Sequence, residues 1–212
     1  MAKNIHVTED EQLARVKKWW KANGTSIVTG VVLGLVLIIG YNWWQKHQQN
    51  LALQASGIFS QLLEASEAED IDKVTELASQ LKNDYGKHDY AAKGLVLAAT
   101  SQIKAGNTEE AKDNLSWVIE NSKLIDNQLL ASYKLARQLY REGAYDEALA
   151  LVDIEQKAGF ASQFFELIGD IYNKKADLNK AQEAYQKAME LMSPTSAGYS
   201  EILQLKINNT AQ

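Results

Sequence analysis

The chain has 212 residues, a formal net charge of −5, one proline and no cysteine. The lack of cysteine excludes a lipid anchor on a cysteine thiol and a cysteine nucleophile, and it agrees with an oxidising compartment. Excess acidic charge argues against nucleic-acid binding, because the phosphates would repel such a surface.

Residues 1–24 form a short segment with five basic and three acidic side chains. The next segment, residues 25–44 (TSIVTGVVLGLVLIIGYNWW), has no charged residue. As a helix it is about 30 Å long, which matches the hydrocarbon core of a bilayer. Trp43 and Trp44 close it, and Trp19 and Trp20 precede it, as at membrane interfaces. A buried core helix is the alternative, but no charged or strongly polar side chain supplies a wet face between Ile27 and Ile39.

The residues around this segment predict an uncleaved span with a defined orientation. The bulky Tyr41-Asn-Trp-Trp end lacks the small residues that a signal peptidase requires. Five basic residues precede the span, whereas the 20 residues after it contain only Lys46. By the positive-inside rule, residues 1–24 should be cytoplasmic and residues 45–212 should lie across the membrane, which in a bacterium is the periplasm.

Residues 45–212 have the size of one domain and a helical composition. They carry 17 basic and 24 acidic side chains, a balance that suits peptide or protein partners. No segment shows sustained alternation of β-branched and polar residues, so no strands are expected. We predict an all-α chain with one transmembrane helix followed by a helical domain.

Three similar turns divide this domain into helix pairs: GNTEEA (106–111), GAYDEA (143–148) and ADLNKA (176–181). Their final alanines are 37 and 33 residues apart, and the repeat resembles the tetratricopeptide pattern of about 34 residues. The last unit fits best, with small residues for close helix approach and aromatic residues as filling: Phe165, Ile168, Gly169, Tyr172, Ala181, Tyr185, Ala188 and Pro194. The sequence therefore predicts a tetratricopeptide-like α-solenoid.

Helices are also expected on either side of these three units. Residues 45–65 should continue directly from the span, and residues 71–81 should form a second helix. Together these two helices fit a diverged first pair that caps the stack. Residues 201–207 should form a terminal helix over the last unit, because an uncovered terminal repeat exposes an apolar face.

No residue pattern predicts catalysis, a metal or a cofactor. His6, His47 and His88 have no partners at ligand or catalytic spacing. The acidic clusters Glu109-Glu110 and Asp146-Glu147 open second helices, where carboxylates meet the positive end of the helix. Phosphate-binding loops and serine elbows are absent from the sequence.

Two sets of residues are candidates for binding other proteins. In tetratricopeptide arrays the first helix of each pair lines a concave groove, which places there Lys93, Thr100, Leu130, Tyr133, Arg137, Tyr140, Gln163, Glu166, Asp170 and Asn173. Tyr133, Arg137 and Tyr140 share one helical stripe, although a solvated face with partly core tyrosines is an equally good interpretation. In the span, Gly30 and Gly34 form a G-x-x-x-G pair that would let a partner helix approach closely.

Both ends of the chain together resemble one family. The start WWKANG (19–24), the glycine-containing span, YNWWQKHQ (41–48), the degenerate repeats and the ending EILQLKINN (201–209) are similar to the YfgM family. That resemblance covers the whole chain. It implies a bacterial inner-membrane protein, an ancillary subunit of the SecYEG translocon, that associates with the periplasmic chaperone PpiD. Exported client proteins are further candidate partners. Because no catalytic, metal or cofactor motif occurs in the sequence, we expect no cofactor and no enzymatic activity.

An alternative within the binding proteins is a tethered repeat scaffold for a cell-division or outer-membrane assembly complex. The repeats alone do not separate these two functions, whereas the family resemblance does. A membrane-bound periplasmic enzyme would need a polar cleft of titratable residues, which nothing in the sequence predicts.

Overall fold

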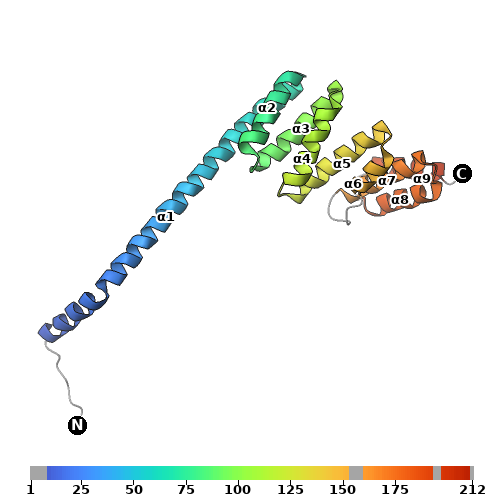
Figure 1. Cartoon of the computed structure of the whole chain (residues 1–212). Coiled ribbons are helices and arrows are strands. Elements are labelled where there is room, and N and C mark those ends of the chain that lie inside the picture. The colour runs from blue at the N-terminus through green and yellow to red at the C-terminus, as the bar shows by residue number, and fades with distance from the viewer. Residues whose placement is uncertain (1–8, 153–159, 193–196, 211–212) are drawn as a thin grey trace, which may run out of the picture. The chain divides into compact units, whose positions relative to one another are not determined.

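The computed structural model describes residues 9–152, 160–192 and 197–210, which form helices joined by short turns, with no strand among them (Figure 1). Two compact units are distinguished, Met1–Leu51 and Ala52–Gln212. The prediction of an all-α chain is confirmed. The helices are α1 (Glu9–Glu67), α2 (Ile71–Tyr85), α3 (Asp89–Ala105), α4 (Thr108–Asn121), α5 (Ile125–Glu142), α6 (Tyr145–Val152), α7 (Ala161–Lys174), α8 (Leu178–Glu190) and α9 (Ala197–Thr210).

The first unit consists of the N-terminal part of α1. This is the one described helix that is long and apolar enough to cross a membrane. Its large apolar side chains are exposed, for example Leu37 at 73% and Trp43 at 69%, so within the described chain no protein surface covers them. Such a continuous apolar surface fits a lipid environment. The predicted span 25–44 lies inside this helix, and the boundaries at residues 24 and 44 stay predictions.

The predicted turns each join two antiparallel helices, in the pairs α3–α4, α5–α6 and α7–α8. Gly106 and Gly143 end α3 and α5 with φ of +89° and +83°, a left-handed conformation that glycine adopts without strain. Ala176 takes this conformation in the third turn, with φ of +59°. Because a left-handed non-glycine residue costs about 1 kcal/mol, the third turn uses the less favourable residue for the same geometry.

The second unit has a core that runs through the successive helix pairs. Its first layer comes from the last turns of α1, where Ala55, Ile58, Leu62 and Ala65 are buried with residues of α2 and α3. The predicted helix over 45–65 is therefore confirmed as a direct continuation of the span. The helix predicted over 71–81 extends to Tyr85, four residues further.

The terminal helix is longer than the predicted segment 201–207. Within α9, Leu203 is fully buried in a small cluster with Ala181, Tyr185 and Ala188 of α8. The helix therefore covers the last pair, as a terminal repeat requires. Pro194, which we assigned to the end of the last repeat, lies outside the described residues.

Close approach between α7 and α8 depends on Gly169. A Cβ added there would lie 2.4 Å from Cε1 and 2.5 Å from Cδ1 of Tyr185. Tyr185 is only 1% exposed, so its ring has no free space into which it could move. The glycine and aromatic positions of the repeat thus fit together as the sequence pattern predicts.

We expect Gly169→Ala to lower the free energy of unfolding by about 1–3 kcal/mol, because the added methyl group overpacks a buried aromatic ring. The matched control is Gly57→Ala, in the exposed surface of α1, where nothing lies within 4 Å of an added Cβ. That control should be neutral or stabilising by up to about 1 kcal/mol, since alanine favours helix over glycine. Urea unfolding followed by circular dichroism measures both, and equal changes would contradict this packing.

Candidate functional site

The predicted groove residues lie on α3, α5 and α7, the first helices of the three pairs, and α5 packs against both α3 and α7. We call the surface formed by these residues the first-helix face. Its members are Lys93 and Thr100 on α3, Leu130, Tyr133, Arg137 and Tyr140 on α5, and Gln163, Glu166, Asp170 and Asn173 on α7. Lys93, Arg137 and Asn173 are exposed, and the others are partly buried.

The middle of the face is built around Tyr133. Its ring meets Phe164 of α7 edge to face, with centroids 5.7 Å apart and an interplanar angle of 82°. The guanidinium of Arg137 lies over the same ring, 5.6 Å from its centroid. Burial raises the pKa of the Tyr133 hydroxyl, so it stays protonated at neutral pH. Tyr133 therefore supports α5 against α7 and is also partly exposed beside the cation of Arg137.

Tyr140 and the α3 residues are less available for binding. The Tyr140 ring packs 5.9 Å from that of Tyr145 and joins the main core. Thr100 donates its hydroxyl proton to the carbonyl oxygen of Val96, at 2.8 Å. Lys93 places its Nζ over the ring of Tyr90, 5.7 Å from the centroid. The two tyrosines of the predicted stripe thus have a structural role, whereas the head group of Arg137 is free of a carboxylate within the described chain.

The α7 end of the face is occupied by the terminal helix. The Lys206 amine of α9 donates to Glu166 at 2.7 Å and to Asp170 at 2.6 Å. Tyr199, also on α9, donates to Glu166 at 2.5 Å, and Tyr185 donates to Asp170 at 2.8 Å. This arrangement, which we call the α7–α9 network, satisfies both carboxylates with groups of the chain itself.

The pKa values in the α7–α9 network reflect these contacts. Burial and then the hydrogen bond to a carboxylate raise the pKa of the Tyr185 and Tyr199 hydroxyls above 10.0. For Lys206, burial alone would lower the pKa, but the hydrogen bonds to Asp170 and Glu166 outweigh it and raise the pKa above 10.5. All three groups are therefore protonated in the folded protein at neutral pH.

Sequence reasoning missed the cations Lys104, Lys134 and Lys206. Lys134 follows Tyr133 and lies one helical turn before Arg137, so the local pattern of charges on α5 could have shown it. Lys104 lies four residues after Thr100 on α3, which is an equivalent local signal. Nothing local identifies Lys206, because its partners are 36 and 40 residues away.

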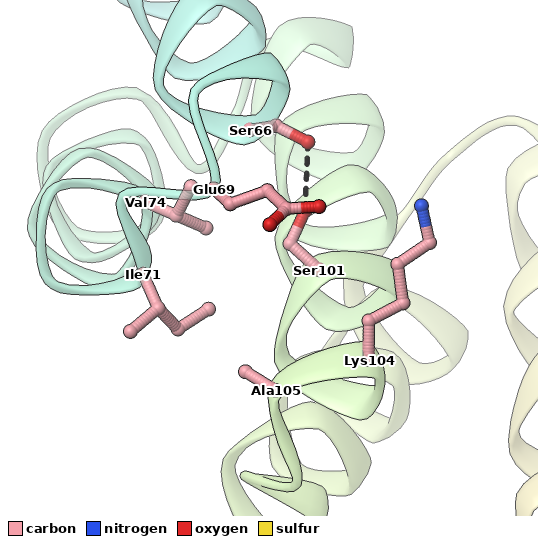
Figure 2. A pocket seen from close by; sticks show the side chains of 7 residues that line it. All are labelled: Ser66, Glu69, Ile71, Val74, Ser101, Lys104 and Ala105. Atoms are coloured by element: carbon pink, nitrogen blue, oxygen red, sulfur yellow. Dashed lines mark hydrogen bonds between the residues drawn. The ribbon is translucent and has the colours of Figure 1, made fainter.

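Cavities also occur away from the first-helix face. One of about 200 Å³ lies between the end of α1, the start of α2 and the end of α3, where Ser66 and Ser101 share a 2.7 Å hydrogen bond (Figure 2). Another of about 150 Å³ lies beside Trp117 and His88. Among the described residues, no three His, Cys, Asp or Glu side chains are placed to hold a metal ion.

The glycine pair of the span lies on the uncovered surface of α1. Nothing lies within 4 Å of a Cβ added at Gly30 or at Gly34. The two glycines, one helical turn apart, therefore leave a shallow area where another helix backbone could pack closely.

Comparison with known proteins identifies relatives for nearly the whole chain. Residues 17–212 match a family model described as a tetratricopeptide repeat-like domain. A Neisseria gonorrhoeae protein named ancillary SecYEG translocon subunit is 28% identical over 96% of this chain and 98% of its own length. The Escherichia coli protein of the same name is 26% identical over 97% and 98%. These matches confirm the resemblance inferred from both ends of the sequence.

A solved structure shows the same fold. MamA from Desulfovibrio magneticus, residues 41 to the end, superposes with a TM-score of 0.51 and 22% identity, over 76% of this chain and 89% of that one. At this identity the likeness concerns the arrangement of helices only.

The α7–α9 network yields a prediction about stability and pH. Lys206→Met should lower the free energy of unfolding at neutral pH by about 1–3 kcal/mol, because two largely buried carboxylates lose their cation. A cation whose pKa is higher in the folded than in the unfolded state stabilises the fold fully below its unfolded pKa of 10.5. This stabilisation is lost as pH rises through the folded pKa. The stability difference from the parent protein should therefore narrow above pH 10.5.

Urea unfolding at a series of pH values measures this difference. Lys174→Met is the control, since Lys174 is exposed on α7 and has no ion pair with any described residue. It should change stability by less than about 0.5 kcal/mol. A Lys206 variant as stable as this control would show that the ion pairs of Lys206 make no measurable contribution to stability.

Proposed function

Since the chain belongs to the tetratricopeptide repeat-like domain family, we propose that it is a membrane-tethered protein-interaction module that acts as an ancillary subunit of the SecYEG translocon. The observation that carries the proposal is the similarity over 96% or more of this chain to proteins with that name. It is supported by a helix that can span a membrane and continues into a repeat core. Neither a fold of this class nor its described side chains suggest catalysis.

The proposed orientation has the N-terminus in the cytoplasm and the repeat unit in the periplasm of a Gram-negative bacterium. The five basic residues before the apolar segment, against one shortly after it, support this orientation. The module would then meet polypeptides as they leave the translocon. In this proposal the repeats link export to periplasmic folding, with the chaperone PpiD and exported clients as partners, as the family resemblance implies.

We infer that the two units bind different partners, because they offer different surfaces. The span offers Gly30 and Gly34 on an uncovered helix surface, which suits a contact with the transmembrane helices of the translocon. The first-helix face offers the exposed Arg137 over the partly buried ring of Tyr133, which suits a soluble polypeptide. A tethered scaffold for another envelope complex would use the same surfaces, and its copurifying partners would distinguish it.

Orientation is tested by cysteine labelling, for which the absence of native cysteines makes every signal specific. Ala14→Cys lies before the span, and Gln186→Cys lies on the exposed surface of α8. A membrane-impermeant maleimide added to spheroplasts should label position 186 and should label position 14 only after the membrane is dissolved. The reverse pattern would place the repeat unit in the cytoplasm.

The role of the span is tested by Gly30→Ile with Gly34→Ile. Branched side chains would keep a partner helix from approaching closely, so recovery of SecYEG with the protein from native membranes should fall severalfold. The control is Gly40→Ile, which enlarges another open glycine of α1 outside the pair. If the double variant and the control both recover SecYEG at the parental level, the glycine pair is not the contact.

Failure to recover SecYEG with the parent protein itself would refute the translocon assignment. A cell-division or outer-membrane assembly complex in its place would support the alternative scaffold function.

A further inference from the structure

The first-helix face has opposite charges at its two ends, and the chain neutralises only one of them. At the α7 end, the carboxylates of Glu166 and Asp170 receive the amine of Lys206. On α3 and α5, Lys104, Lys134 and Arg137 carry three positive charges. The ion pairs found within the described ranges (9–152, 160–192 and 197–210) include none of these three cations. We call them the basic cluster.

The three cations of the basic cluster are close enough to repel one another. Lys134 and Arg137 lie one turn apart on α5, and Lys104 lies near the end of α3, which packs against α5. Burial lowers the pKa of Lys134, and the charges of Arg137 and Lys104 lower it further. A half-buried lysine held beside two other cations costs folding free energy, and no internal contact offsets that cost.

The neighbouring acidic side chains that the structure describes do not form ion pairs with the basic cluster. The charges of Glu166 and Asp170 reach Tyr133, but both carboxylates are already bound to Lys206. Glu69 lines the same cavity as Lys104, without an ion pair between them. Figure 2 shows the Nζ of Lys104 extending away from Ile71 and Val74, which line that cavity. The positive end of the face is therefore open to a ligand.

We propose that the basic cluster binds an acidic, extended peptide segment of a partner protein, which lies across α3 and α5. Carboxylates of the segment would pair with Lys104, Lys134 and the guanidinium of Arg137, which is suited to bidentate contact. The partly exposed side chain of Tyr133 would contact apolar side chains between those carboxylates. This inference rests on the proposed function only in taking the first-helix face as the interaction surface.

A peptide fits the site better than an anionic membrane surface. Residues 45–212 carry 17 basic and 24 acidic side chains, so the unit as a whole is repelled by anionic lipid. A short segment instead experiences mainly the local charge, because salt screens interactions beyond about 8–10 Å. The aromatic edge beside the cations also offers apolar contact, which a lipid headgroup does not use.

The test measures binding of a fluorescein-labelled peptide to the full chain in detergent by fluorescence anisotropy. The probe repeats the sequence Glu-Leu-Asp-Ala over about 12 residues, which span roughly 40 Å when extended. Its matched control replaces every acid by the corresponding amide. The acidic peptide should bind at least tenfold more tightly than the amide peptide, and added NaCl should weaken its binding, as expected for charge pairing.

Substitutions locate the binding site. Lys134→Gln with Arg137→Gln should weaken acidic-peptide binding at least tenfold, and Lys104→Gln, at an exposed position, should weaken it severalfold without affecting the fold. The charge-matched control is Lys174→Gln with Lys187→Gln, two exposed lysines of α7 and α8, which should leave the affinity unchanged. Circular dichroism confirms the fold of each variant.

Three results would overturn the proposal. The first is equal binding of the acidic and amide peptides, and the second is an equal loss of peptide affinity in the cluster variants and in the charge-matched control. The third is displacement of the peptide by a soluble short-chain phosphatidylglycerol at concentrations where NaCl of equal ionic strength has no effect. The last result would assign the cluster to lipid headgroups. Because these measurements contain no translocon, their failure leaves SecYEG recovery, and with it the proposed function, unaffected.

Discussion

The packing of the last turns of α1 against α2 and α3 is the contact on which the repeat unit depends. In a solenoid each layer touches only its neighbours, so the first layer has no other source of apolar cover. Leu62 and Ala55 are fully buried there, and a Cβ added at Gly94 of α3 would meet Leu81 at 2.3 Å and Leu62 at 3.7 Å. The helix that can cross a membrane therefore also begins the core of the repeats.

The two ends of the repeat unit are covered through different kinds of interaction. At its start the closure is apolar, from α1 residues such as Leu62. At its end, α9 contributes one fully buried leucine, Leu203, together with the pairing of Lys206 to Glu166 and Asp170. Ion pairs of this kind determine the direction and register in which α9 packs on α7 more than they add to net stability. They also remove two carboxylates from the interaction surface, which leaves that surface positive within an acidic unit.

The sequence predicted the architecture because its signals are local. The signal for the membrane span is a charge-free segment of 20 residues. The signal for the turns is shorter, with Gly106 or Gly143 placed just before the acidic start of the next helix. The repeat register followed from small and aromatic positions such as Gly169 and Tyr185, which the structure places in contact. Those are the features that a period and a turn pattern determine.

The parts that the sequence did not predict depend on long-range contacts. The pairing of Lys206 with Asp170 joins residues 36 positions apart, and no period or motif indicates it. Tyr133 was equally compatible with the core and with a binding surface, and the position of Phe164 gives it a share in both. Tyr85, the last residue of α2, donates its hydroxyl proton to the side chain of Gln54, 31 residues earlier, and no local pattern indicates this contact. Such details require the packed structure.

If the protein is a membrane-tethered interaction module, the first-helix face should be the surface that contacts its partners. Site-specific photocrosslinking in intact cells can decide this, with the crosslinker placed at Lys93 or Arg137 on this face and at Glu183 or Gln186 on the exposed side of α8. We expect crosslinks to other envelope proteins from the first-helix face and few from α8. Equal crosslinking from both surfaces, or crosslinks from α8 alone, would contradict it.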